Sequence, residues 1–188
     1  MIRTILPLFA LPLLASVPAL ASENVPVSQF DSMELRGGGE VLVKRGPVQR
    51  VTILEGSSQF TAIRVMSHGR LRIDACNASC PHTYRLKILV ESPTVPVLAV
   101  DGGGKITTSE GFASQPQLTA AVNGGGAIDA TALAADAATA AVHGGGEIKL
   151  RAVRTLTAAV NGGGSIRYWG DPEVTTAISG GGTVRPGR

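Results

Sequence analysis

Apolar and polar residues alternate along much of this chain, which is the period of a β-strand with one buried face. In the first half, runs such as EVLVKR (40–45), RVTILE (50–55) and RLKILVE (85–91) follow this period. Turn signals rich in glycine, proline and serine separate the runs, for example at 46–47 and 56–58. We therefore predict short strands joined by turns over residues 22–100, arranged less regularly than the strands that follow.

The second half, residues 101–188, repeats a phrase in which three consecutive glycines stand between two β-branched residues. Examples are AAVNGGGAI, AAVHGGGEI and AAVNGGGSI, and an earlier triplet begins at Gly37. The first glycines of the later triplets are separated by 22, 20, 18 and 18 residues, at Gly102, Gly124, Gly144, Gly162 and Gly180. A period of about 20 residues indicates a solenoid of stacked units.

Glycine triplets within strands need a physical reason, because each glycine there costs roughly 0.5–1 kcal/mol relative to alanine. Glycine is favoured at a sharp corner, where it adopts a positive φ and where a missing Cβ lets successive turns approach closely. We therefore predict an all-β solenoid with one column of Gly-Gly-Gly corners, beside a ladder of polar residues from Asp101 to Ser179. At ~3.3 Å per residue, a unit of about 20 residues is long enough for a three-sided coil.

The segment 128–141, IDATALAADAATAA, permits a second interpretation. It is rich in alanine, the residue with the highest helix propensity. The neighbouring glycines oppose a helix at about 1 kcal/mol each, and the next unit, EIKLRAV, alternates as a strand does. A strand is favoured, and a helix in this segment remains open.

The first 21 residues have the pattern of a secretory signal peptide. Arg3 precedes an apolar run that contains prolines, and Ala19 and Ala21 form an A-x-A cleavage pattern. The run is shorter than the ~20 residues that span a membrane. We predict cleavage after Ala21, no transmembrane anchor after cleavage, and one exported domain over residues 22–188, located in the periplasm or on the outer, extracellular surface.

Charge and cysteine content narrow the chemistry. Loss of Arg3 with the signal peptide leaves a net charge of about +2, which argues against nucleic acid as a partner. Cys76 and Cys80 lie in CNASCPH, and an exported protein is expected to join them in a local disulfide. A metal site that includes His82 is the alternative for these cysteines.

Two motifs near the ends of the mature chain resemble those of a known family. FDSMELRGGGEVLV (30–43) fits F-x-x-x-x-L-x-G-x-G-x-V-x-V, and IRYWGDP (166–172) fits I-x-Y-x-G-x-P. With the Gly-x-Gly-x-Ile units between them, the chain resembles the auto-transporter adhesin head domain, or GIN domain, over about residues 28 to 184. This resemblance implies a right-handed, single-stranded β-helix with an adhesin-like role in the cell envelope.

Catalysis is not expected from the distribution of acidic residues. Cleavage of a glycosidic bond needs two carboxyl groups about 5–9.5 Å apart. The acidic residues of the repeats are scattered singly, at Asp129, Asp136, Glu147, Asp171 and Glu173. We therefore predict no catalytic, metal or cofactor site, and the alternative is a carbohydrate-active enzyme, a polysaccharide lyase or hydrolase, on the same scaffold.

Two groups of residues are candidates for binding. A basic stripe for an anionic surface would form if the strands RLRI and RLKI paired, and it would contain Arg70, Arg72, Arg85 and Lys87. Tyr168 and Trp169 are candidates for stacking on a sugar ring. We expect a non-catalytic, adhesin-like or structural module whose partner is an envelope polysaccharide or surface component, with a second subunit as a candidate cover for the last coil.

Overall fold

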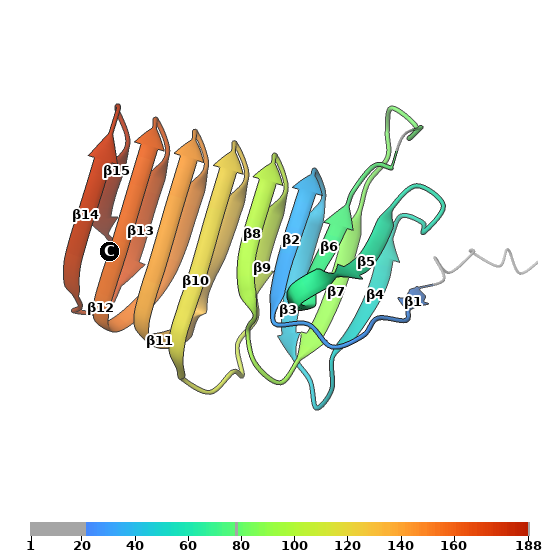
Figure 1. Cartoon of the computed structure of the whole chain (residues 1–188), viewed down its shortest axis with the longest axis horizontal. Helices are drawn as coiled ribbons and strands as arrows, with labels where there is room; N and C mark the ends of the chain where they lie inside the picture. Colours follow the sequence, from blue (N-terminus) through green and yellow to red (C-terminus); the bar gives the residue numbers. More distant parts are fainter. Residues whose placement is uncertain (1–21, 78, 188) are drawn as a thin grey trace, which may run out of the picture.

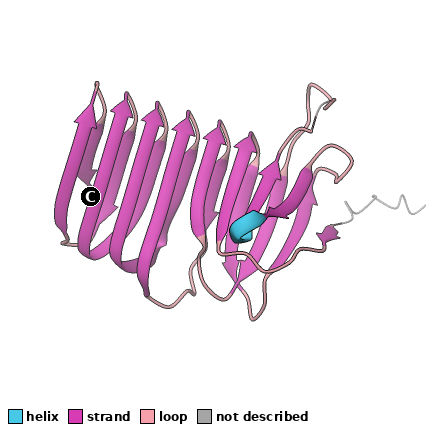
Figure 2. Cartoon of the chain, in the orientation of Figure 1, coloured by secondary structure: helices cyan, strands magenta, loops and turns pink. Residues whose placement is uncertain are grey.

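The computed structural model describes residues 22–77 and 79–187, which form an all-β structure with one short 3-10 turn, η1 (Ser67–Gly69). Figure 2 shows this turn as the one helical segment in an array of strands. The predicted signal peptide, residues 1–21, lies outside the described residues, so its cleavage stays a prediction. No helix in the described part is long and apolar enough to cross a membrane.

The strands are short in the first half of the chain and longest among the repeats. In chain order they are β1 (Glu23–Val25), β2 (Ser32–Gly37), β3 (Glu40–Arg45), β4 (Arg50–Glu55), β5 (Ala62–Met66), β6 (Arg70–Asp74), β7 (Lys87–Ser92), β8 (Val97–Gly102), β9 (Lys105–Thr108), β10 (Gln115–Gly124), β11 (Ala127–Gly144), β12 (Glu147–Gly162), β13 (Ser165–Trp169), β14 (Glu173–Ser179) and β15 (Thr183–Pro186).

These strands lie in two layers that face each other across the core (Figure 1). Layer A contains β5, β6, β2, β8, β10, the second parts of β11 and β12, and β14. Layer B contains β4, β7, β3, β9, the first parts of β11 and β12, β13 and β15. All pairings from β8 to the C-terminal end are parallel, so equivalent residues of successive units stack in columns.

Each repeat unit supplies two strand segments, one to each layer. In β11, residues 127–129 pair with β9 in layer B, whereas residues 135–144 pair with β10 in layer A. The register shifts between Ala130 and Ala134, where the chain passes from one layer to the other. The expectation of a three-sided coil is therefore wrong, because this passage takes a few residues within one strand instead of a third side.

The alanine-rich segment 128–141 lies within β11, so the favoured strand is correct and the helical alternative is wrong. Its alanines alternate between the core and the surface. Ala130, Ala138 and Ala140 are buried in the core, and the parallel ladder to β10 and β12 satisfies the backbone. Tertiary pairing thus overrides the high helix propensity of alanine.

The glycine triplets connect each layer A strand to the next layer B segment. At the five predicted corner positions, φ of the first glycine lies between +108° and +119°, a region that L side chains rarely adopt. The turns also stack closely, since the N–H of Gly145 donates to the carbonyl oxygen of Gly124 at 3.0 Å. A Cβ added to Gly144 would lie 2.7 Å from that same oxygen. The turn therefore requires glycine both for its φ and for its contact with the preceding turn.

The core between the layers is built from columns of β-branched residues that flank the triplets. One column in layer A contains Val100, Val122, Val142 and Val160, and its counterpart in layer B contains Ile106, Ile128, Ile148 and Ile166. All eight side chains are buried. Their neighbours in sequence point outward, as the period-two alternation predicts.

The first half of the chain extends the same two layers and ends them with antiparallel strands. The turn at Gly37 stacks on Gly102, because β2 pairs with β8 and β3 pairs with β9, both parallel. Beyond them, β4 and β5 add antiparallel to β7 and β6. At the opposite end, β14 and β15 each pair with one strand among the described residues, and the inward-facing Ile178 is 48% exposed.

Cys76 and Cys80 form a disulfide in the loop between β6 and β7, with 5.9 Å between their Cα atoms. The bridge closes a short loop, for which the chain-entropy model gives about 2 kcal/mol of stabilisation. We expect reduction to lower the free energy of unfolding by about this amount in denaturant titrations. The Cys76→Ala/Cys80→Ala variant should have the lowered stability and no response to the reductant. Two free thiols in the unreduced, unfolded protein would contradict the bridge.

Candidate functional site

The outer surface of layer B near the C-terminal end carries a column of cationic side chains. Strand register places Lys149 of β12 beside Arg167 of β13, and Arg167 beside Arg185 of β15. The strands are parallel and about 4.8 Å apart, so the three cations follow one another along the stack. Each follows a buried or half-buried β-branched residue by one position, and alternation therefore points it outward.

A second outward column lies two residues further along the same strands. It brings Arg151 of β12 beside Trp169 of β13. Thr131, which follows the paired segment of β11, lies near these residues at the wall of the same hollow. The two columns together place an indole ring among four cationic side chains contributed by three successive units.

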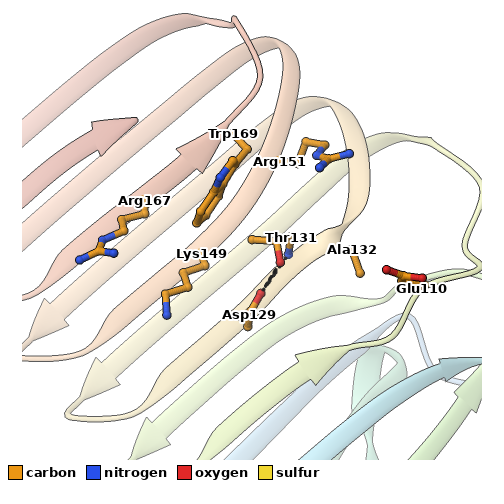
Figure 3. A pocket seen from close by; sticks show the side chains of 8 residues that line it. All are labelled: Glu110, Asp129, Thr131, Ala132, Lys149, Arg151, Arg167 and Trp169. Atoms are coloured by element: carbon orange, nitrogen blue, oxygen red, sulfur yellow. Dashed lines mark hydrogen bonds between the residues drawn. The ribbon is translucent and has the colours of Figure 1, made fainter. Parts of the chain in front are cut away.

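Two surface hollows lie on either side of Trp169. The larger, of about 740 Å³, is lined by Glu110, Asp129, Thr131, Ala132, Lys149, Arg151, Arg167 and Trp169 (Figure 3). The other, of about 580 Å³, is lined by Arg167, Trp169, Arg185, Pro186 and Gly187. Arg167 and Trp169 belong to both, so they form the ridge between the hollows.

Trp169 is half-buried because the chain end packs against its ring. Gly187 lies beside the indole, and a Cβ at that position would overlap the ring atoms. The N–H of Gly187 donates to the carbonyl oxygen of Tyr168 at 2.7 Å, which keeps the chain end in this place. The indole is therefore held on one side, and it still lines both hollows.

Tyr168 and Trp169 do not form the joint stacking surface that the sequence suggested. Tyr168 packs against the hydrophobic core, in register with the buried Leu150, whereas Trp169 lines the outer hollows. Adjacent residues of a strand point to opposite faces. This candidate is corrected to Trp169 alone.

The acidic groups of the hollow are engaged with near neighbours. Oδ1 of Asp129 accepts hydrogen bonds from the backbone N–H and the hydroxyl of Thr131, at 3.2 and 2.7 Å. Glu147 contacts two cations, with 3.2 Å from its Oε2 to Nζ of Lys149 and 3.9 Å from its Oε1 to Nε of Arg167. One carboxylate thus serves two members of the cationic column.

The cations of this surface are only partly paired. Nε of Arg167 is buried and has no hydrogen-bond partner, because its separation from Glu147 exceeds hydrogen-bonding distance. Within residues 22–77 and 79–187, Arg151 and Arg185 make no ion pair, and both are exposed. The hollow therefore has guanidinium donors that are available to an anionic ligand.

The basic stripe predicted in the first half is not brought together. Its condition was that the strands RLRI and RLKI pair, but β6 pairs with β2 and β5, whereas β7 pairs with β3 and β4. Arg70 and Arg72 therefore lie in layer A, while Lys87 lies in layer B and Arg85 comes two residues before it. The predicted stripe is wrong because β6 and β7 do not pair with each other. β2 occupies the position next to β6, and β3 occupies the position next to β7.

Most of these residues also have acidic partners. Arg70 lies 3.9 Å from Glu34, Arg72 lies 3.0 Å from Asp74, and Lys87 lies 3.2 Å from Glu55. Arg36 of β2 behaves similarly, since its hydrogen bond with Glu34 raises the pKa of its guanidinium. Paired charges on an exposed sheet keep the strands soluble and discourage edge pairing.

Three of the scattered carboxylates have close partners. Asp129 and Glu147 are engaged as described above, and Asp136 lies 3.8 Å from Arg154. Among the described residues, no three His, Cys, Asp or Glu side chains form a group that would hold a metal ion. The side chains of this surface can bind a ligand by stacking, hydrogen bonds and charge.

The cationic column was missed from the sequence although the repeat contains its signal. In each of the last three units, the residue five positions after the first glycine is basic, namely Lys149, Arg167 and Arg185. In the two preceding units the same position holds Asp129 and Thr107. Aligning the units on their glycines is enough to find the column.

Comparisons with known proteins agree with this architecture. Residues 113–172 match the sequence model of a family described as "Putative auto-transporter adhesin, head GIN domain". The matched range is less than half of the chain and contains β10, β11, β12 and β13, which carry most of the larger hollow. The resemblance noted from the motifs is therefore confirmed over these units. No curated protein is similar enough to match.

Several solved structures are similar to this chain over most of its length. A protein described as a "putative adhesin" from Bacteroides fragilis matches with a TM-score of 0.51 at 19% identity, over 88% of this chain and 96% of that chain. A "putative adhesin" from Parabacteroides distasonis matches with a TM-score of 0.44 at 19% identity, over 88% and 96%. A "putative lipid binding protein" from the same species has a TM-score of 0.38 at 18% identity, over 89% and 96%. The first similarity shows a shared fold.

Proposed function

We propose that this protein is an exported, non-catalytic binding module of the cell envelope that attaches to a surface polysaccharide, as an adhesin head does. The single observation that carries the proposal is the surface around Trp169, where two hollows and four cations meet on one rigid face. Aromatic and guanidinium side chains are the groups that most often dominate binding at protein surfaces.

The scaffold supports a binding role in a second way. We infer that the chain is a right-handed β-helix with glycine corners, which the parallel register and the stacked turns of the repeats favour. Such a stack presents identical positions of successive units at a fixed spacing of about 4.8 Å. A polymer with its own repeat is a natural ligand for a surface of this kind.

The export of the chain rests on its first residues and on its cysteines. An apolar N-terminal run that ends in an A-x-A pattern directs secretion, and the Cys76–Cys80 bridge suits an oxidising compartment. The location in the periplasm or on the outer surface follows from these features. We include both compartments in the proposal.

The experiment that tests this function incubates residues 22–188 with immobilised envelope polysaccharides and measures retention together with the release of new chain ends. We expect retention of the protein on at least one polymer without cleavage. Trp169→Ala should weaken that retention roughly tenfold or more, as truncation of an aromatic anchor does. Thr157→Ala, on the exposed face of layer A, is the control and should bind as the unmodified protein does.

Two outcomes would contradict the proposal. Release of chain ends would assign the protein to carbohydrate-active enzymes, and the search would move to the carboxylates beside Lys149. Equal retention of Trp169→Ala and the unmodified protein would mean that the polymer binds somewhere other than the surface around Trp169.

A further inference from the structure

The four cations around Trp169 indicate the charge of the ligand. Lys149, Arg167 and Arg185 occupy one position in three successive units, and Arg151 is next to the indole. Glu147 is the one acidic group within ion-pair distance of any of them among the described residues. Neighbouring like charges repel one another, so a ligand with regularly placed negative charges would relieve this repulsion.

Arg167 is the member of the column that most clearly lacks a partner. Its Nε is buried without a hydrogen bond, although its guanidinium lines both hollows. A buried donor without a partner is costly, and a carboxylate is an acceptor that a guanidinium binds through two parallel hydrogen bonds. The Arg167 side chain is 40% exposed, so an anionic group bound at this ridge would pair with the accessible part of the guanidinium.

Two acidic residues of the larger hollow, Glu110 and Asp129, come before the cations in the stack of units, and Asp129 is beside Lys149 in register. Figure 3 shows Glu110 on the opposite side from Arg167, with Asp129 turned toward Thr131. Along this column the charge changes from acidic at β11 to basic at β12, β13 and β15, which favours a ligand with acidic groups toward β13 and β15 and hydroxyl groups toward β11. Sugar hydroxyls donate hydrogen bonds to carboxylates, so one sugar unit satisfies both sides.

Trp169 distinguishes a sugar acid from a simple anion. Its ring stands between the two hollows and lines both, so a ring-shaped ligand can stack on it while its acidic group reaches Arg167 or Arg151. A phosphate or sulfate ion alone has no apolar face for the indole. The combination of an aromatic platform and adjacent guanidinium groups therefore selects a ligand that has both features.

We propose that this surface binds an acidic polysaccharide whose sugar units carry carboxylates, laid across β12, β13 and β15 with one unit against Trp169. The inference rests on the proposed function of the same surface and adds the chemical class of the ligand. In this arrangement the chain of sugars runs along the stack, and successive carboxylates meet Lys149, Arg167 and Arg185.

The test compares two polymers that share one backbone, polygalacturonate and its methyl ester, which has lost the negative charges. We expect polygalacturonate to bind at least tenfold more tightly than the ester, and added salt to weaken only the charged polymer. Arg167→Gln and Arg185→Gln should each weaken binding of polygalacturonate by roughly fivefold to tenfold, in line with loss of a charge-assisted contact.

The matched control is Arg154→Gln, which removes the same charge from β12 outside both hollows. Arg154 is exposed and lies 3.8 Å from Asp136, so we expect its replacement to change binding less than twofold. Trp169→Phe keeps an aromatic face and should bind more tightly than Trp169→Ala. Thermal unfolding of each variant shows whether the fold is retained, and the polar substitutions lie on the surface where little destabilisation is expected.

The outcomes separate this inference from the proposed function. Equal binding of both polymers with loss in Trp169→Ala would overturn the acidic ligand and leave the polysaccharide module intact. Absence of binding to every polysaccharide would overturn both. Binding to vesicles that contain phosphatidylglycerol, without binding to polygalacturonate, would overturn the inference in favour of a lipid surface.

Discussion

Replacement of Gly144 by alanine is expected to lower the free energy of unfolding by about 3 kcal/mol. Gly144 has φ of +113°, where a residue with a Cβ carries backbone strain of about 1–3 kcal/mol. The new Cβ would also lie 2.7 Å from the carbonyl oxygen of Gly124, so the two turns would have to separate. Separation would weaken the hydrogen bond from Gly145 to that oxygen. Denaturant titration followed by circular dichroism measures the loss.

The triplet itself contains the matched control for this substitution. A Cβ on Gly145 would meet no atom within 4 Å, and its φ lies outside the positive region. Gly145→Ala is therefore expected to change stability by less than about 1 kcal/mol, with the favourable entropy of alanine in the unfolded chain offsetting any loss. Similar stabilities for the two variants would contradict the explanation of the glycine column given above.

Truncation of Leu150 to alanine is expected to cost about 3 kcal/mol, within the range of 2–5 kcal/mol seen for buried leucines. Leu150 is fully buried, and strand register places it between Ala130 and Tyr168. Ala130 is small, so it leaves little side-chain volume on that side to fill the cavity. Tyr168 would lose part of the packing that holds it in the core. Equilibrium unfolding in urea gives the change in free energy.

Val153→Ala in the same strand separates burial from strand propensity. Val153 is 47% exposed, so its truncation removes fewer buried atoms and should cost well under 1 kcal/mol. Leu150→Ala and Val153→Ala both introduce alanine into β12. Equal effects would mean that the strand, and not the core, limits stability at these positions.

Much of the second half of the chain could be predicted from its sequence, because its determinants are local. The glycine triplets indicate turns, and the β-branched residues on either side, such as Val142 and Ile148, indicate buried columns. These features recur in every unit at a spacing of 18–22 residues, so one correct interpretation of a unit applies to all of them. The positive φ of the first glycine follows from the same local argument.

The strand pairing of the first half could not be predicted from the sequence, because its partners are far apart along the chain. β6 and β7 are consecutive strands, but β2 and β3 from earlier in the chain pair with them in separate layers. Nothing in RLRI or RLKI specifies these partners. The expected stripe from Arg70 to Lys87 required β6 and β7 to be partners. Their actual partners lie in different layers, so the residues of the stripe are separated.

The candidate site was only partly accessible to sequence reasoning. Trp169 was identified, but its pairing with Tyr168 ignored the alternation of a strand, a rule that was available beforehand. The cationic column needed the units to be aligned on their glycines, which places Lys149, Arg167 and Arg185 at one position. The unpartnered Nε of Arg167 depends on side-chain geometry and is visible only in the structure.

The two edges of the stack differ in what they permit. At the glycine edge, every turn contacts the preceding one, so its shape is the same from unit to unit. At the opposite edge, the units differ in length. Ala130 of β11 pairs with Leu150 of β12, and further along Ala137 pairs with Thr155. Between these two pairs β11 has two more residues than β12, and the strands then return to register. The geometry of the glycine edge is thus the same in every unit, whereas the other edge accepts insertions. Sequence variation, and any new loop grafted for a new ligand, should accumulate on that second edge.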